Sequence, residues 1–467
     1  MLVSNTLLRS GFFVQRIGQV LTLAILLAGT AIADSGMPPS PSSAGAGGET
    51  LLRPFGEKMI SVKPSGVYQQ QGQVVSQQTK TYQAAKTDQS VIYVYSGGHY
   101  SLTDGYLNKT GASSNVNSSN MYGNNAAVLA TQGSHVDLTE CTVHSDGHGA
   151  NAVLAYGEGS FIQVENCTIS TIKESSRGVH ATYGGTITVS NSTISTQGAH
   201  SAALATDRGG GTVKATNVTA TTQGEGSPGI YSTGNIEVYA GNYVALGSEV
   251  AVIEGKNRIT LNGTDITAYQ KRGVMLYQSH SGDSVPGEGR FQMVDGSLTN
   301  SSSGPVFFVT NTTARVSLTS VDIMNSSNTF LRVVAPGKNE PDTLPQWGQE
   351  GGKVTFDAIR QELTGDVVTD SRSSVTMDLN EASILRGGIN INHEGNVDLT
   401  LDESSRWVSP SNSYVNVIRG AQLQDSVMAN IDAPAGVTIY YHKMTDLNGS
   451  WLKGNYILTS GGKLVMN

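Results

Sequence analysis

Few side chains in this chain of 467 residues have types and spacings that indicate chemistry. Cys141 and Cys167, the only two cysteines, can form a disulfide or a pair of buried thiols. His148 stands in the run Asp-Gly-His-Gly at 146–149, and an imidazole close to carboxylates can act as a general acid or base. That chemistry needs partner carboxylates, and the sequence contains no Asp-Asp pair. Which of these groups meet depends on the elements that carry them.

A repeat in the sequence indicates what those elements are. Val136, Leu138, Cys141 and Val143 lie at spacings of two, three and two residues, and the same spacings return at steps of 26, 25 and 26 residues. The next copies are Ile162, Val164, Cys167 and Ile169, then Ile187, Val189, Ser192 and Ile194, then Val213, Ala215, Val218 and Ala220. A unit this short has no core of its own, so each copy must pack against its neighbours, as in a solenoid.

The spacing within the repeat predicts strands rather than helices. A period of two places Val136 and Leu138 on one face and Asp137 on the other, and the extra residue before Cys141 turns a corner. A third apolar run follows each pair, as at residues 152–155. We therefore predict an all-β fold, a parallel β-helix solenoid with about three short strands per coil. Roughly twelve coils would give a stack on the order of 55 Å long.

Patterns outside the repeat predict how the chain is organised. In order, the expected segments are a signal peptide at 1–33, a flexible leader at 34–57, an N-terminal cap at 58–94, the parallel β-helix at 95–436 and a C-terminal capping hairpin at 437–467. Arg9 and Arg16 precede a short apolar run, and Ala33 ends a small-x-small cleavage site, as in signal peptides. Gly461 and the glycine after it indicate the turn of the hairpin.

Charge and hydropathy restrict the partners. The chain has 29 Lys and Arg against 37 Asp and Glu, a net charge of -8, so no basic stripe is expected to bind nucleic acid. The signal peptide predicts export, to the extracellular space, the cell surface or the periplasm. No later stretch approaches 18 apolar residues, which predicts no integral membrane segment in the mature chain.

A resemblance covers most of the mature chain. Residues 93–467 include Asn-Ser-Thr-Ile-Ser-Thr at 191–196 and Gly-Val-Met-Leu-Tyr-Gln at 273–278, and they end in the run 451–467. With these features the sequence resembles the adhesin-like right-handed parallel β-helix proteins of bacteria. More loosely, it is similar to autotransporter passenger domains of pectate-lyase-like fold. The resemblance implies a right-handed solenoid that is secreted or surface-associated and has no assigned enzymatic activity.

The register of the repeat predicts a column of asparagines. Asn166, Asn191 and Asn217 each precede the third position of the pattern, so they are expected to stack at one corner as a ladder of amides. The same residues begin Asn-x-Ser/Thr sequons, which is the alternative reading. A glycan there would lie against packed backbone, so the ladder is favoured.

The two cysteines occupy equivalent inward positions of adjacent coils. Their Cα atoms are then expected about 5 Å apart, which is within disulfide range. An exported protein is exposed to oxidising conditions that form such a bond. The alternative is a pair of stacked thiols that behave as small apolar residues.

Some outward residues are candidates for ligand contact. Thr168, Thr193 and Thr219 are predicted to line up on the second strand, either as good strand formers or as a hydroxyl array that binds water or glycan. Tyr277 and Trp347 lie near insertions and can stack on sugars or cover exposed core.

The sequence predicts no catalytic residue, no cofactor and no metal ligand. Outward positions of the first strand do not repeat carboxylates: they are Asp137, Gln163, Thr188, Lys214, Glu237, Thr260 and Gln292. His148 is flanked by glycines, as in polygalacturonases, but the aspartates with which that family's histidine works are missing. Pectate lyases need clustered carboxylates for calcium and an arginine base, and no such cluster is expected.

These features predict a secreted or surface-exposed, non-enzymatic β-helix that mediates adhesion or recognition. Its expected ligands are glycans or the surfaces of host or neighbouring cells. The alternative is a polysaccharide-active enzyme, similar to a pectate lyase or polygalacturonase, which needs acidic groups that converge on one lateral face. A more distant alternative is an ice-binding solenoid, which needs a flat face of unbroken threonine pairs.

Overall fold

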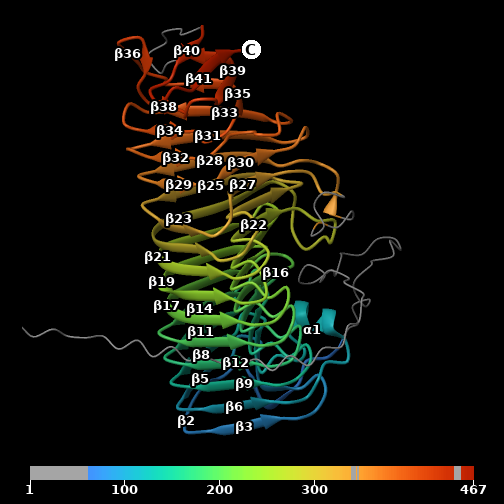
Figure 1. Cartoon of the computed structure of the whole chain (residues 1–467). Coiled ribbons are helices and arrows are strands. Elements are labelled where there is room, and N and C mark those ends of the chain that lie inside the picture. The colour runs from blue at the N-terminus through green and yellow to red at the C-terminus, as the bar shows by residue number, and fades with distance from the viewer. Residues whose placement is uncertain (1–61, 338–342, 344–346, 446–453) are drawn as a thin grey trace, which may run out of the picture. The chain divides into compact units, whose positions relative to one another are not determined.

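The computed structural model describes residues 62–337, 343, 347–445 and 454–467. In this part of the chain, parallel strands stack into a β-solenoid of about 15 turns (Figure 1). The predicted all-β parallel β-helix is confirmed, with more turns than the roughly twelve expected from the sequence. The predicted signal peptide at 1–33 and leader at 34–57 lie outside the described residues.

Sheets of parallel strands run along the stack, and two of them are long. The A sheet contains β1 (Gly66–Gln71), β4 (Ser90–Tyr95), β7 (Val128–Thr131), β10 (Val153–Tyr156), β13 (Val179–Thr182), β16 (Leu204–Asp207), β18 (Ile230–Ser232), β20 (Ala251–Glu254), β22 (Val274–Tyr277), β24 (Phe307–Thr310), β27 (Thr329–Val333) and β30 (Asp366–Thr369). It supplies the third strand of the coils as far as β30, as the sequence predicts for the earlier coils.

The B sheet supplies the first and second strands of the coils. Its strands are β2 (Val74–Gln78), β3 (Thr81–Ala84), β5 (His99–Thr103), β6 (Tyr106–Lys109), β8 (His135–Thr139), β9 (Thr142–Ser145), β11 (Phe161–Glu165), β12 (Thr168–Thr171), β14 (Thr186–Ser190), β15 (Thr193–Thr196), β17 (Thr212–Thr222), β19 (Asn235–Ala245), β21 (Arg258–Ala268), β23 (Glu288–Asn300), β25 (Thr313–Thr319), β26 (Asp322–Asn325), β28 (Lys353–Ile359), β31 (Ser374–Asn380), β33 (Asn396–Leu401), β35 (Ser413–Arg419), β39 (Thr438–Thr445), β40 (Tyr456–Ile457) and β41 (Lys463–Met466).

Two small sheets complete the later coils. They are a parallel sheet of β29 (Glu362–Thr364), β32 (Ile384–Arg386), β34 (Arg406–Val408) and β38 (Ile431–Asp432), and an antiparallel pair of β36 (Leu423–Gln424) and β37 (Val427–Met428).

The strand register follows the apolar repeat. Val136 of β8 pairs with Ile162 of β11, which pairs with Ile187 of β14. These three side chains are fully buried in one continuous aliphatic core. Gln163 lies between two buried neighbours of its own strand and is exposed. The alternation of the sequence therefore sets which side chains face the core.

In the regular coils a residue in the left-handed conformation makes the corner between the first and second strands. Asn166, Asn191 and Asn217 occupy this position with φ of 54°, 48° and 53°. Asparagine adopts this conformation more readily than most residues that carry a Cβ. The second step of the repeat is three residues instead of two because it includes this corner residue. In β17 the backbone hydrogen bonds of the sheet continue through the corner. The first and second strands predicted for this coil therefore form one strand of 11 residues.

The ends of the described stack differ in structure. Residues 66–84, which lie in the predicted cap at 58–94, form β1, β2 and β3, and these pair in parallel with β4, β5 and β6. This segment is therefore a regular coil, because its Gln-rich strands alternate as the later strands do. At the other end, β40 pairs antiparallel with β41, and β41 pairs in parallel with β39.

One helix, α1 (Val116–Tyr122), interrupts the strands of the described residues. Asn115 caps it by accepting a hydrogen bond from the backbone N–H of Ser118 at 2.8 Å. The Thr182 hydroxyl at the end of β13 donates to the carbonyl of Met121 at 2.8 Å, which ties the helix to the A sheet. No helix in the described part of the chain has the length and apolar character to cross a membrane.

The register generates a direct test. Leu138→Asp or Val164→Asp places an unpaired charge in the core, and we expect each to lower the free energy of unfolding by at least about 3 kcal/mol. Gln163→Asp faces solvent beside Asp137, so its cost is about 1 kcal/mol or less. Chemical denaturation followed by circular dichroism measures the difference. Equal losses for inward and outward substitutions would contradict the register.

Candidate functional site

The predicted threonine column lies on the outer face of the B sheet. Thr168 pairs with Thr193, and Thr193 pairs with Thr219, and all three side chains are exposed. The next two coils place Asn242 and Asp265 at this position. The column is therefore a short hydroxyl array rather than the unbroken face that ice binding needs.

The three predicted ladder asparagines lie at exposed corners. The Asn217 amide donates to the Asn191 side-chain oxygen at 2.8 Å, which is the contact expected in an amide ladder. Asn166 occupies the same corner one coil earlier. Because all three side chains are exposed, the packing does not shield their sequons.

Cys141 and Cys167 are buried in adjacent coils as free thiols. The backbone N–H of Cys141 donates to the Cys167 Sγ at 3.2 Å, and that thiol donates to the Glu165 carbonyl at 3.1 Å. The structure therefore contains the stacked thiols rather than the disulfide. The hydrogen bond with Cys141 and burial both raise the pKa of the Cys167 thiol, which keeps it protonated and slow to react at neutral pH.

The two aromatic candidates for sugar stacking are not on the surface. Tyr277 is 1% exposed and Trp347 is 5% exposed, and their ring centroids lie 4.9 Å apart. Both rings are therefore buried against other parts of the protein and do not face a ligand. This agrees with the alternative reading, in which they cover the core. His148 forms an exposed ion pair with Glu174 at 3.0 Å on its corner loop.

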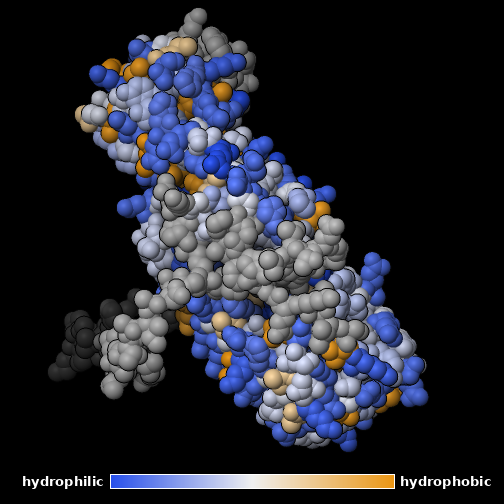
Figure 2. Space-filling view, turned by 90° about the vertical axis from the view of Figure 1, so that its right-hand side faces the viewer, coloured by the Kyte–Doolittle hydropathy of each residue, from blue (hydrophilic) through white to orange (hydrophobic). Residues whose placement is uncertain are grey.

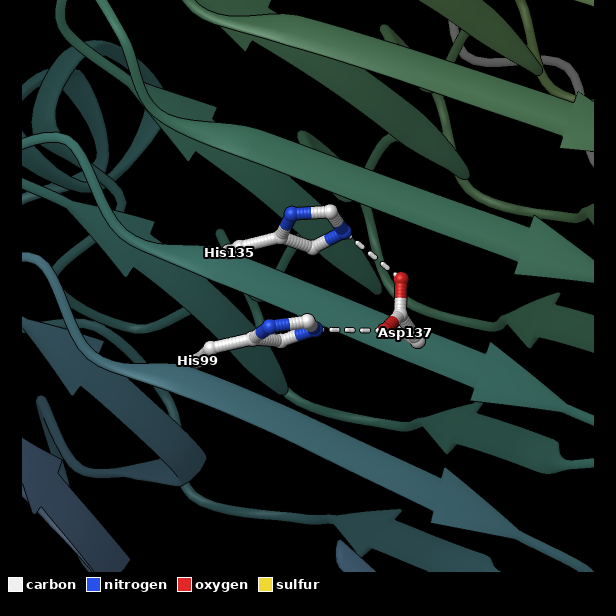
Figure 3. A group of neighbouring side chains, drawn as sticks. All are labelled: His99, His135 and Asp137. Atoms are coloured by element: carbon white, nitrogen blue, oxygen red, sulfur yellow. Dashed lines mark hydrogen bonds and ion pairs between the residues drawn. The ribbon is translucent and has the colours of Figure 1, made fainter. Parts of the chain in front are cut away.

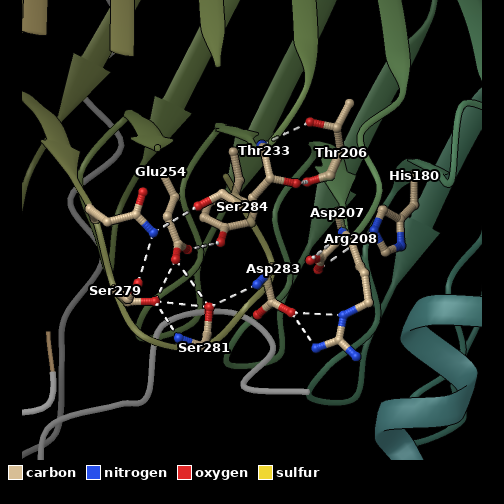
Figure 4. A network of polar contacts seen from close by, with 12 residues as sticks. His180, Thr206, Asp207, Arg208, Thr233, Glu254, Ser279, Ser281, Asp283 and Ser284 are labelled. Carbon is tan, nitrogen blue, oxygen red and sulfur yellow. Dashed lines mark hydrogen bonds and ion pairs between the residues drawn. The ribbon is translucent and has the colours of Figure 1, made fainter. Parts of the chain in front are cut away.

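Acidic groups gather on the outer face of the A sheet, where the sequence analysis did not look for them. The buried charge cluster, shown in part in Figure 4, comprises Arg177, His180, Asp207, Arg208, Glu254 and Asp283. By strand alternation His180, Asp207 and Glu254 point away from the solenoid core. All six residues are nevertheless buried. The prediction that no carboxylate cluster forms concerned outward positions of the first strand, whereas this cluster lies on the sheet of the third strand.

Glu254 anchors one half of the buried charge cluster. Its Oε2 accepts hydrogen bonds from the hydroxyls of Tyr231 at 2.8 Å and Tyr277 at 2.9 Å. Its Oε1 accepts from the hydroxyls of Ser279 and Ser281, which belong to the segment after β22 (Figure 4). These bonds hold the segment against the A sheet.

Two arginines and a histidine form the other half. Arg208 donates from Nε and Nη2 to the Asp283 Oδ1 at 3.1 and 2.6 Å. Arg177 Nη2 and His180 Nε2 lie 3.5 and 3.8 Å from the Asp207 Oδ2. Within the described residues, the side-chain nitrogens of Arg177 and His180 have no hydrogen-bond partner.

Burial controls protonation in the buried charge cluster. Desolvation and the charge of Arg177 lower the pKa of His180 well below its ordinary value, so the imidazole is neutral at pH 7. Desolvation and the nearby carboxylates of Asp207 and Glu254 raise the pKa of Asp283, against the effect of Arg208. Two neighbouring carboxyl groups, one of them with a raised pKa, are the groups that acid–base chemistry on a polysaccharide requires.

A second group of residues lies on the outer face of the B sheet in the late coils. Tyr414 of β35 pairs in register with Tyr440 of β39, and their rings stack with centroids 5.0 Å apart and planes 8° apart. The His393 ring stacks on the Tyr414 ring, with centroids 3.9 Å apart and planes 11° apart. We call these three residues the aromatic column. His393 is exposed, and the two tyrosines are half-buried.

A pocket of about 170 Å³ adjoins the aromatic column. Besides the three rings, its lining includes the polar residues Asn390, Glu394, Asn396, Asn416, His442 and Asn467. The Asn416 amide donates to the Asn396 side-chain oxygen at 3.0 Å, which fixes the orientation of both amides. The pocket therefore combines aromatic rings with amide and carboxylate groups at a solvent-accessible position.

The sequence contains a signal for the aromatic column that the analysis did not use. Tyr440 follows Tyr414 by one step of the repeat, as the strand register shows. The apolar pattern is less regular in these late coils, which obscures the equivalence of the two tyrosines. His180, Asp207 and Glu254 of the buried charge cluster lie at outward positions of the third strand, where the pattern of the first and second strands gives no signal.

Comparison with known proteins adds no assignment. No protein-family model matches this sequence, and a search of curated proteins finds no significant match. The resemblance to adhesin-like proteins therefore stays a prediction, and function must be argued from the geometry of the sites.

The buried His180 predicts a pH dependence of stability. Because its folded pKa lies below the ordinary 6.5, the unfolded chain binds the extra proton first as the pH falls. Stability is complete above about pH 6.5 and is lost below it, by up to about 1.4 kcal/mol per pH unit for such a group. His180→Leu is expected to flatten this dependence between pH 7 and 5. The measurement is the thermal midpoint at each pH.

The control for this experiment is His148→Gln, which changes an exposed histidine and should keep the wild-type dependence. Part of the dependence is expected to persist in His180→Leu, because burial also lowers the pKa of His200, to about 4. Parallel pH profiles for the wild type and His180→Leu would contradict the assignment.

Proposed function

We propose that this chain is an exported, non-enzymatic recognition protein that binds glycans of host or neighbouring cells through its lateral surface. The observation that carries the proposal is the aromatic column with its polar pocket. The pocket brings aromatic rings, amides and a carboxylate together on one exposed face. A sugar needs this combination, because it presents C–H groups to an aromatic face and hydroxyls to polar side chains.

The stacking of the rings determines how such a ligand binds. In the aromatic column Tyr414 lies between His393 and Tyr440, so both of its faces are occupied. The rings at the two ends each have one neighbour within the column, and both tyrosines line the pocket. A sugar unit would therefore stack on an end ring and place its hydroxyls against the asparagines. A volume of about 170 Å³ suits a small unit of a longer chain rather than a large buried ligand.

The surface character agrees with a hydrophilic ligand. Figure 2 shows hydrophilic residues over most of the visible face, with hydrophobic residues scattered among them. The threonine column and the corner asparagines add hydroxyl and amide groups along the B sheet. A repeated polar surface can contact successive units of a polymer or a cell-surface glycan layer, with the aromatic column as the specific site.

A glycan array with the purified protein tests this proposal. Tyr440→Ala removes an end ring, and Asn416→Ala removes the fixed amide. We expect each to weaken binding about five- to tenfold, since one aromatic contact or hydrogen bond contributes about 1 kcal/mol. Tyr239→Ala is the matched control, because Tyr239 is an exposed tyrosine on β19. Absence of glycan binding, or equal binding by all variants, would contradict the proposal.

A polysaccharide-active enzyme is the second candidate, and the buried charge cluster favours it. Asp207, Glu254 and Asp283 converge with a neutral histidine on one lateral face, which is the arrangement that the enzyme alternative requires. The burial of all three carboxyl groups is the argument against it. In the described arrangement Glu254 and the Asp283–Arg208 pair hold the segment after β22 in place, and the three carboxyl groups have no surface for a substrate.

The assay for this candidate is depolymerisation of pectin and polygalacturonate, with and without calcium. We expect no new reducing ends and no unsaturated products. Products that are lost in Asp207→Asn or Glu254→Gln, and retained in His148→Gln, would replace the recognition proposal with the enzyme.

A further inference from the structure

Two histidines and an aspartate meet on the outer face of the B sheet in the early coils (Figure 3). The Nε2 atom of His99 lies 2.7 Å from the Asp137 Oδ2, and the Nε2 atom of His135 lies 2.7 Å from the Asp137 Oδ1. The donor atoms of the three side chains all lie within 4.8 Å of one another. Three potential ligands therefore lie close together on this part of the surface.

The strand register builds this arrangement. His99 of β5 pairs directly with His135 of β8, and their rings stack with centroids 4.2 Å apart. Asp137 follows His135 by two residues, so alternation places both on the same face of β8. The residue opposite Asp137 on β5 is Ser101, whose hydroxyl donates to the Asp137 Oδ2 at 2.9 Å. Backbone pairing fixes all four positions.

Neighbouring side chains hold the Asp137 carboxylate in one orientation. One oxygen accepts from the Ser101 hydroxyl, and each oxygen contacts one imidazole. The rings of Phe161 and His135 pack edge to face with their centroids 4.7 Å apart, so Phe161 covers one side of the His135 ring. The side chains are 26–38% exposed, so a cation from solvent can reach them.

We propose that His99, His135 and Asp137 form a binding site for a divalent transition-metal ion, with Zn²⁺ as the best fit. Two imidazole nitrogens and one carboxylate oxygen are a common protein ligand set for zinc. Ca²⁺ and Mg²⁺ prefer all-oxygen sites, so this set selects against them. Ser101 orients the carboxylate from behind, as outer groups do in metal sites. The sequence analysis expected no metal ligand, and this proposal is independent of the glycan site.

The present arrangement must adjust to hold a metal ion, because the two imidazole nitrogens lie within 4.8 Å of each other and must come to about 3.3 Å. Bonds of about 2.0–2.1 Å in tetrahedral geometry put the donor atoms about 3.3 Å apart. The two 2.7 Å contacts must therefore open by about 0.6 Å, which partly exposed side chains can do without a change in the backbone. Three protein ligands leave the fourth position of a tetrahedral ion open to water or to an anionic group of a ligand.

Isothermal titration of the purified protein with Zn²⁺ tests the proposal, with Co²⁺ as a second probe whose visible absorption reports nitrogen and oxygen ligands. We expect one ion per chain, with no competition from Mg²⁺ or Ca²⁺. His99→Gln and Asp137→Asn are each expected to weaken binding by at least about tenfold, and Ser101→Ala by less. His144→Gln is the matched control, because His144 lies on β9 and contacts Ser170. It should bind as the wild type does.

Each other outcome decides against the site. Absence of saturable Zn²⁺ binding would leave the three residues as a hydrogen-bonded surface group. Binding that is equal in the wild type, His99→Gln and Asp137→Asn would place the ion elsewhere. Circular dichroism verifies that each variant is folded, and His135→Gln replaces any variant that loses its strand signal.

Discussion

Each coil of this solenoid depends on the packing of its inward aliphatic side chains against those of the coils above and below. A coil of about 25 residues buries too few groups to fold alone, whereas a buried valine or isoleucine contributes about 1.5–3 kcal/mol when neighbours cover it. Val136, Ile162 and Ile187 show the arrangement, since they pair in register and are fully buried. Backbone hydrogen bonds between parallel strands fix the same register.

The same stacking creates columns on the outside. Residues at equivalent positions of adjacent coils lie side by side, about 4.8 Å apart. Like residues therefore form the threonine column and the aromatic column, and unlike residues form mixed groups such as His99, His135 and Asp137. The outer face of a solenoid can therefore form binding sites without a deep cleft. Each coil contributes one exposed residue, and the residues of adjacent coils lie next to one another along the axis. Both the glycan proposal and the metal proposal rest on this property.

The outer face of the A sheet differs from that of the B sheet because other parts of the chain cover it. There the segment after β22 and helix α1 cover the strands, so outward residues such as His180 and Glu254 are buried. A buried charge is costly unless it is paired, and Glu254 meets this requirement with four hydroxyl donors. Within the described residues, Arg177 has only a longer contact with Asp207, and the neutral His180 lies 3.8 Å from the same carboxylate. His180 is where protonation is expected to limit stability.

The sequence by itself determined the coil, its strands and the inward or outward direction of each repeat residue, because these follow from local alternation and one left-handed corner residue. Tyr414 and Tyr440 were also predictable in principle, since they are separated by one repeat step. Only the tertiary structure decided what lies over each outer face. Tyr277 is outward by alternation yet buried, because a later segment folds back over it. His99 meets His135 across a long insertion that breaks the regular step, so the strand pairing and not the spacing brings them together. Local periodicity fixes which way a side chain points, whereas its neighbours depend on insertions and long-range contacts that no local pattern records.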